Sequence, residues 1–117
     1  DAINAALTRI ALPLDVIVLG MGEDMHTASL FPGADRLAAA LAPDAPPAMA
    51  LRAPGAEEAR VTLTAPVIAA AGRAILLIRG QSKQDALDRA MQASGPADAP
   101  VRVALDRGGP TEIWFAP

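Results

Sequence analysis

Two short apolar runs, each closed by a glycine, constrain the fold of this chain most strongly. Residues 16–19 read Val-Ile-Val-Leu and lead directly into Gly20, and residues 74–78 read Ala-Ile-Leu-Leu-Ile and lead through one arginine to Gly80. Unbroken β-branched and aliphatic runs of this length are typical of strands buried on both faces, as in parallel sheets. The two runs therefore favour a parallel sheet that is covered on both sides.

Helical patterns alternate with these strands. The apolar spacing and the cap signals predict helices over residues 2–10, 34–41, 65–71 (after Thr64 as N-cap) and 83–93 (after Ser82 as N-cap). Further strands are predicted at 60–64 and 111–115, and 101–105 is a short apolar segment. The stretch 43–56 is rich in proline and alanine and is expected to be a loop, extended near 49–52. This alternation predicts an α/β fold, a mostly parallel sheet with helices on both faces in a Rossmann-like three-layer arrangement. Residues 1–117 would form a single domain that is part of a larger one.

Composition excludes several classes of function. Lys and Arg number 10 against 13 Asp and Glu, the net charge is −3, and aromatic residues make up 3% of the chain, so a nucleic-acid partner is not expected. The absence of cysteine excludes thiolate nucleophiles and Cys-ligated zinc in this chain, and it suits the cytoplasm. Since no run of 18 apolar residues occurs, no membrane partner is expected. A small anionic substrate needs only a few local cations and stays open.

His26 is the only histidine, and its surroundings favour a catalytic role over a structural one. It lies shortly after Gly20, at the carboxyl end of a predicted strand, where open α/β sheets place their ligands. Asp24 is close enough in sequence to hold one ring nitrogen. A neutral imidazole takes a proton from water near pH 7, and a carboxylate supports the imidazolium that results. This pair predicts hydrolysis of an activated ester such as a lactone, with no metal and no cofactor.

Other polar residues suggest an anion site. Thr27 or Ser29 would cap a helix whose free N–H groups attract an anion, and Lys83 follows Gly80 at the start of a predicted helix. The alternative interpretation of Lys83 is an ordinary solvated side chain. Arg60 borders a strand and either adds charge or faces water.

Two other interpretations of this region are weaker. Ser29 as a nucleophile does not fit, because HTASL lacks the G-x-S-x-G pattern and no second histidine is available as its base. The segment GMGEDM lacks the third glycine of a dinucleotide loop, so its glycines indicate a turn.

The segments LDVIVLGMGEDMHTASLFPG, RVTLTAPVIAAAGRAILLIRG, QSKQDALDRA and PVRVALDRGGPTEIWFAP together resemble 6-phosphogluconolactonases over nearly the whole chain. The resemblance implies hydrolysis of 6-phospho-D-glucono-1,5-lactone to 6-phosphogluconate in the pentose phosphate pathway, with a sugar phosphate as the small-molecule partner. It implies that His26 is the general base, with Asp24 beside it, and that Lys83 binds the phosphate. The expected substrate-binding residues are Gly20, Gly22, Thr27, Arg60 and Lys83.

The chain departs from the family pattern in two respects. Met25 stands where the family has glycine, so we expect either a strained backbone at positive φ or a side chain that crowds the pocket. Family members are also about twice as long, so this chain resembles their C-terminal half. The resemblance then implies an exposed apolar face or edge of the sheet, and weak stability or self-association.

Two alternatives to the hydrolase remain open. One is a non-catalytic member of the fold that binds a sugar phosphate without turnover. The other is an enzyme like the related glucosamine-6-phosphate deaminases and isomerases, which share the glycine-rich start of the motif but diverge from HTASLFPG.

Overall fold

The computed structural model describes residues 2–117, which form two sheets and five helices. The parallel sheet contains β1 (Val16–Leu19), β4 (Arg73–Arg79) and β5 (Thr111–Ala116), and the second sheet contains β2 (Ala48–Leu51) and β3 (Arg60–Leu63). The helices are α1 (Ala2–Leu7), α2 (Leu37–Leu41), α3 (Ala65–Ala70), α4 (Gln81–Gln92) and α5 (Arg102–Leu105). No helix in the described residues 2–117 is long and apolar enough to cross a bilayer.

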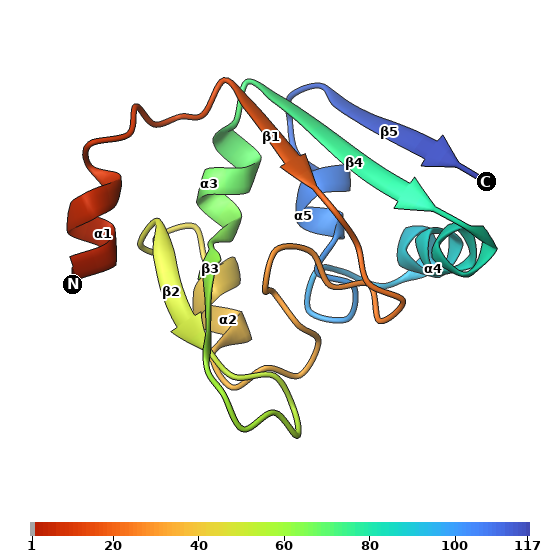
Figure 1. Ribbon diagram of the computed structural model, residues 1–117, viewed down its shortest axis with the longest axis horizontal. Helices are drawn as coiled ribbons and strands as arrows, with labels where there is room; N and C mark the ends of the chain where they lie inside the picture. Colours follow the sequence, from red (N-terminus) through yellow and green to blue (C-terminus); the bar gives the residue numbers. More distant parts are fainter. Residues whose placement is uncertain (1) are drawn as a thin grey trace.

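The parallel sheet has β4 at its centre, with β1 on one side and β5 on the other (Figure 1). Val18 pairs with Ile75 across β1 and β4, and Leu76 pairs with Ile113 across β4 and β5. All strands of this sheet run in the same direction, so their carboxyl ends lie at one edge. The predicted α/β class and the mostly parallel sheet are confirmed.

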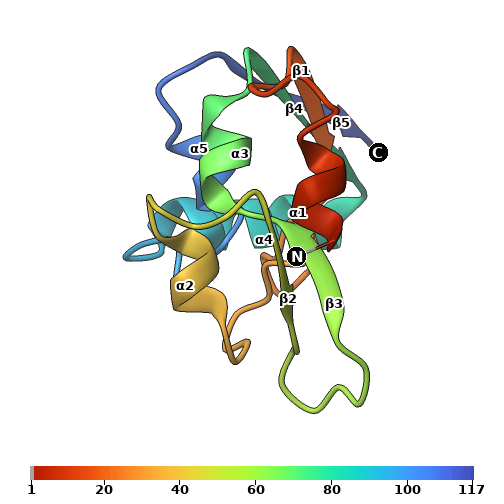
Figure 2. The same ribbon diagram turned by 90° about the vertical axis from the view of Figure 1, so that its left-hand side faces the viewer.

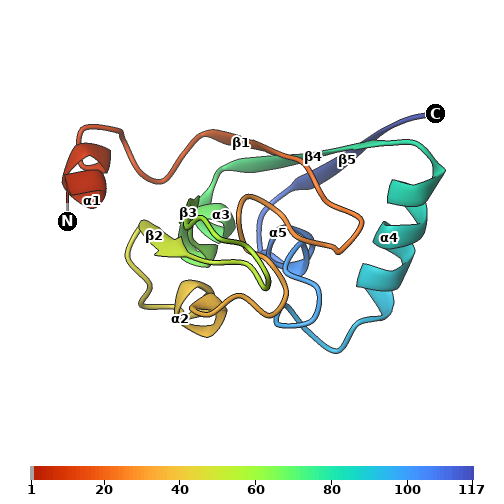
Figure 3. The ribbon, with the colours of Figure 1, turned by 60° about the horizontal axis from the view of Figure 1, so that its bottom comes forward.

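Within residues 2–117, helices α3, α4 and α5 cover one face of the parallel sheet, and the opposite face is open (Figure 3). Successive side chains of a strand point to opposite faces. Accordingly Leu19 and Leu76 are buried under the helices, whereas Val18 is 57% and Leu77 is 48% exposed. The expectation of strands buried on both faces is therefore wrong for these residues, because an apolar run does not reveal which face has a covering layer. The exposed apolar face implied by the family resemblance is confirmed.

Strands β2 and β3 form an antiparallel hairpin that stands apart from the parallel sheet (Figure 2). Part of the predicted loop 43–56 is thus strand β2. Residues 60–64 were expected in the mostly parallel sheet, but the connection 52–59 is too short for a parallel crossover, so β3 folds back on β2. The side-chain amide of Asn4 donates to the Ala48 carbonyl and accepts a hydrogen bond from the Ala48 amide. These two bonds connect α1 to the start of this hairpin.

Of the two predicted helix caps, Ser82 is wrong, and Thr64 is right in position but makes no capping bond. Helix α4 begins at Gln81, with Gly80 in the N-cap position at φ 86°, so Ser82 lies inside the helix and does not cap it. Thr64 does occupy the N-cap position of α3 but makes no capping bond, because its buried hydroxyl donates to the Pro46 carbonyl at 2.6 Å. The apolar segment 101–105 contains the short helix α5.

Candidate active site

The loop that follows β1 folds tightly around Gly22. The Gly22 amide donates to the His26 carbonyl at 3.0 Å, and the Met25 amide donates to the Gly22 carbonyl at 2.9 Å. A β-carbon at Gly22 would lie 2.2 Å from His26 Nδ1 and 2.6 Å from Asp24 Oδ1. The imidazole and the carboxylate therefore occupy the space that a side chain at position 22 would need, and only glycine fits.

Asp24 holds the imidazole of His26, as the sequence spacing predicts. Asp24 Oδ1 lies 2.5 Å from His26 Nδ1 and also accepts a bond from the His26 amide at 3.1 Å. Partial burial works to raise the pKa of Asp24, but the side-chain and amide hydrogen bonds from His26 and the charge of the imidazolium outweigh it, so the pKa lies below its usual value. The contact engages Nδ1 and leaves Nε2 as the ring nitrogen available for chemistry.

Met25 adopts the left-handed backbone conformation, with φ 70°. This conformation costs an L-residue with a side chain on the order of 1–2 kcal/mol, which accounts for glycine at this position in the family pattern. The Met25 side chain packs against the hydrophobic core and is not among the residues that line the cleft described below. The expected strain is thus present, whereas the expected crowding of the pocket is not observed.

Four backbone carbonyls of this loop accept hydrogen bonds from elements outside it or from its far end. Thr27 Oγ1 donates to the Gly20 carbonyl at 2.8 Å, and the Val101 amide donates to the Met25 carbonyl at 3.0 Å. From α4, Lys83 Nζ reaches the Met21 carbonyl at 2.7 Å and Arg89 reaches the Glu23 carbonyl at 2.8 Å. These contacts fix the path of the loop on either side of His26.

Thr27 and Ser29 do not cap a helix, since residues 27–36 contain no helix or regular strand. The Thr27 side chain is fully buried and its hydroxyl is used by the Gly20 carbonyl. The Ser29 amide donates to Thr62 Oγ1 at 3.0 Å. The predicted anion site at a helix start after these residues is therefore wrong, because no helix begins there.

Phe31 and Arg60 form an arrangement with His26 that the sequence does not reveal. The rings of Phe31 and His26 lie 4.3 Å apart between centroids, tilted by 32°. The Arg60 guanidinium lies 5.6 Å from the centroid of the Phe31 ring. Phe31 belongs to the HTASLFPG stretch, and membership of that motif is the one signal that could have singled it out.

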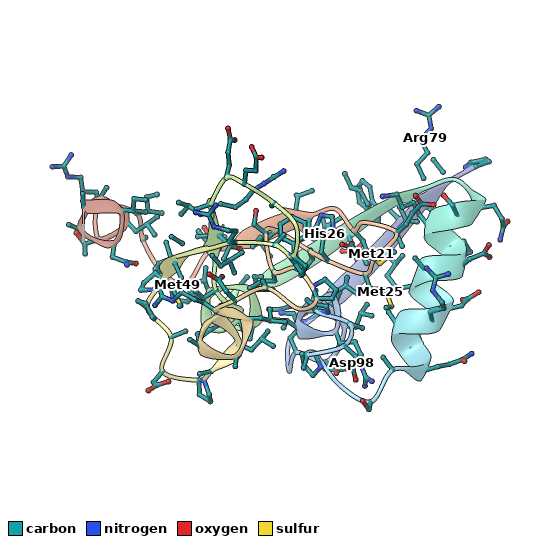
Figure 4. All side chains as sticks on the ribbon, turned by 90° about the horizontal axis from the view of Figure 1, so that it is seen from below. Met21, Met25, His26, Met49, Arg79 and Asp98 are labelled. Atoms are coloured by element: carbon teal, nitrogen blue, oxygen red, sulfur yellow. The ribbon has the colours of Figure 1, made fainter. Side chains whose placement is uncertain are left out.

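A cleft of about 450 Å³ opens at the carboxyl end of β1. Its lining includes Gly20, Gly22 and His26 from the loop after β1, Lys83 from the distant helix α4, and apolar side chains of β1 and β3. Figure 4 shows His26 beside Met21 and Met25, whereas Arg79 points away on the open side of the sheet.

The lining thus contains three of the five expected substrate-binding residues, Gly20, Gly22 and Lys83, while Thr27 is buried and Arg60 lies outside the set. Among residues 2–117, no group of three His, Asp or Glu side chains is arranged to hold a metal ion.

Fold and site together define an α/β protein with a cleft at the carboxyl end of a parallel strand, lined by Lys83 and by a histidine that Asp24 holds. Residues 1–114 match the family of glucosamine-6-phosphate isomerases and 6-phosphogluconolactonases. The chain belongs to this family.

Individual relatives support the same family assignment. The chain is 43% identical over 110 residues to the 6-phosphogluconolactonase of Rhizobium meliloti, with 92% of this chain and 47% of the relative covered. It is 46% identical over 116 residues to the 6-phosphogluconolactonase of Mesorhizobium japonicum, with 97% and 48% covered. Among solved structures, a 6-phosphogluconolactonase from Shewanella baltica superposes with a TM-score of 0.93 at 30% identity, with all of this chain and 50% of that one covered. The chain thus spans about half the length of these relatives.

Proposed function

We propose that this chain contributes the catalytic His–Asp pair for hydrolysis of 6-phospho-D-glucono-1,5-lactone to 6-phosphogluconate, the reaction of the oxidative pentose phosphate pathway. The observation that carries the proposal is the 2.5 Å contact between Asp24 Oδ1 and His26 Nδ1, with His26 lining the cleft that also contains Lys83. The names of the relatives give the substrate.

In the proposed reaction, His26 Nε2 takes a proton from a water molecule as that water attacks the lactone carbonyl carbon. The bond between this carbon and the ring oxygen then breaks, and the ring oxygen receives the proton from His26, so the imidazole ends neutral. The new carboxylic acid loses its own proton to solvent. Asp24 holds Nδ1–H and stabilises the imidazolium that exists between the two transfers.

Lys83 is proposed to bind the phosphate. One of its donors goes to the Met21 carbonyl, which aims the ammonium group into the cleft, and its remaining donors are available to an anion. Gly20 gives the sugar close access to the backbone of the loop, whereas the space that a side chain at Gly22 would need is taken by His26 and Asp24. Thr27 contributes indirectly, because it holds the Gly20 carbonyl in place.

The test of the proposed function is acid release from freshly prepared 6-phospho-D-glucono-1,5-lactone, after subtraction of the spontaneous rate. The proposal expects an excess rate with this lactone and a much smaller one with the unphosphorylated glucono-lactone, because Lys83 then has no phosphate to bind. No excess rate with the phosphorylated lactone would contradict the proposal. Replacing Lys83 by methionine should raise KM more than it lowers kcat.

Binding without turnover is the second candidate. Two observations favour it, the strained Met25 beside His26 and the coverage of only about half of each relative. Calorimetric titration with 6-phosphogluconate separates the two candidates, since binding with no excess hydrolysis would support the second. Activity on glucosamine 6-phosphate would instead indicate the deaminase alternative. The cytoplasmic location stays a prediction.

A further inference from the structure

The contacts around the imidazole of His26 constrain it from two sides. Asp24 bonds to Nδ1, which fixes the edge of the ring that points to the carboxylate. Phe31 lies against the ring at 4.3 Å between centroids, with a tilt of 32°. A single hydrogen bond leaves the ring free to rock about that bond, whereas an aromatic ring packed against it restricts the rocking.

Phe31 is in turn held from β3. Arg60 and Thr62 lie two residues apart on this strand, so both point to the same side of it. Thr62 Oγ1 accepts the Ser29 amide at 3.0 Å, and the Arg60 guanidinium lies 5.6 Å from the centroid of the Phe31 ring, within the range of a cation–π contact. One side of the hairpin thus supports both ends of the segment from Ser29 to Phe31.

We propose that Phe31 is a positioning residue that sets the plane of the His26 imidazole, and that Arg60 acts through Phe31 rather than on the substrate. The role of His26 as general base, on which the catalytic consequence rests, is the proposed function above. Arg60 lies outside the residues that line the cleft, whereas its contact with Phe31 is direct. The ring plane matters because a base must point its lone pair at the water it deprotonates, and small misalignments cost large factors in rate.

The first test needs no substrate. The His26 Nδ1 proton is followed by NMR, and its exchange with water reports how firmly the ring is held against Asp24. Phe31→Leu should speed this exchange about tenfold or more, Phe31→Tyr should leave it within about twofold, and Arg60→Met should have an intermediate effect. The matched control is Phe115→Leu, the same change at the other phenylalanine of the chain, which is 50% exposed on β5. Unchanged exchange in Phe31→Leu would overturn the proposal, whatever the protein's activity.

The second test is a double-mutant cycle on lactone hydrolysis. If Arg60 acts through Phe31, Arg60→Met lowers kcat with KM nearly unchanged, and the effect disappears in the Phe31→Leu background. An effect of Arg60→Met that is confined to KM and persists in that background would show direct substrate binding and overturn the role given to Arg60. If no hydrolysis is detected with the unaltered chain, the proposed function fails, while the exchange measurement still decides whether Phe31 positions the ring.

Discussion

His26 owes its setting to residues that leave room for it as much as to those that touch it. Gly22 supplies the room, Asp24 supplies the acceptor, and Met25 accepts a left-handed backbone so that the turn can close. The contact between Asp24 and His26 could be predicted from the sequence, because residues two apart in a tight turn are close whatever the rest of the fold does. The contacts of Phe31, Arg60 and Arg89 could not, because they depend on how distant elements pack.

Gly22 and Gly20 form a matched pair for testing the close approach. In Gly22→Ala the new β-carbon would overlap the imidazole and the Asp24 carboxylate, so we expect the Asp24–His26 contact to be lost and lactone hydrolysis to fall by about 100-fold or more, within the range of general base catalysis. In Gly20→Ala the β-carbon meets nothing within 4 Å, so the contact should survive. NMR of the His26 ring protons reads the contact directly. Equal loss of the contact in both variants would contradict the steric account.

Met25 allows the backbone strain to be measured apart from packing. Met25→Ala removes the side chain that packs on the core but keeps the penalty of φ 70°, whereas Met25→Gly removes both. The glycine variant should therefore be more stable than the alanine variant by about 1 kcal/mol, despite the greater chain entropy that glycine loses on folding. Urea unfolding of the two variants gives the difference. An alanine variant at least as stable as the glycine variant would show that the turn stores no strain at this residue.

At the scale of elements, β3 and the loop after β1 depend on each other. The sequence predicts β3 as a strand from its alternating pattern, but the pattern does not say which strand will pair with it. The expectation that it joins the parallel sheet fails because the short connection 52–59 forces a hairpin with β2. This arrangement places Arg60 and Thr62 next to the segment that follows His26.

Substitutions at Thr62 test whether the loop after β1 depends on its contacts with β3. Its side chain is 3% exposed, and its hydroxyl both accepts the Ser29 amide and donates to the Leu63 carbonyl at 2.8 Å. Thr62→Val keeps the shape and leaves the partly buried Ser29 amide without its partner, so the free energy of unfolding should fall by about 1–3 kcal/mol. Thr62→Ser keeps the hydroxyl and is the control. Hydrogen exchange at the Ser29 amide should accelerate in the valine variant alone, and equal acceleration in both would contradict the account.

At the scale of the whole molecule, the parallel sheet has one covered and one open face. Val18, Leu77 and Trp114 make the open face apolar, with Trp114 54% exposed. The sequence predicts the strands themselves because their apolar runs are long enough to mark them. The apolar runs alone do not show that one face is open, because that depends on which layers the chain itself provides; the expectation of an exposed face comes from the family resemblance and the length of the chain.

We expect the chain to self-associate through this open face at micromolar concentrations, because contiguous apolar surface of this kind is poorly tolerated in water. Leu77→Lys should reduce the association, whereas Val61→Lys, at a residue 51% exposed on the separate hairpin, should not. Sedimentation velocity over a range of concentrations measures the effect. A chain that stays monomeric and unfolds cooperatively at high temperature would contradict this expectation.

The measurement that tests the central claim most directly is the excess rate of 6-phospho-D-glucono-1,5-lactone hydrolysis in His26→Gln beside the unaltered chain. Glutamine keeps a polar side chain of similar reach and cannot act as a base. If His26 deprotonates the attacking water, the excess rate should fall by a factor of about 10²–10⁴, with a small change in KM. A His26→Gln variant that hydrolyses the lactone as fast as the unaltered chain would contradict the account.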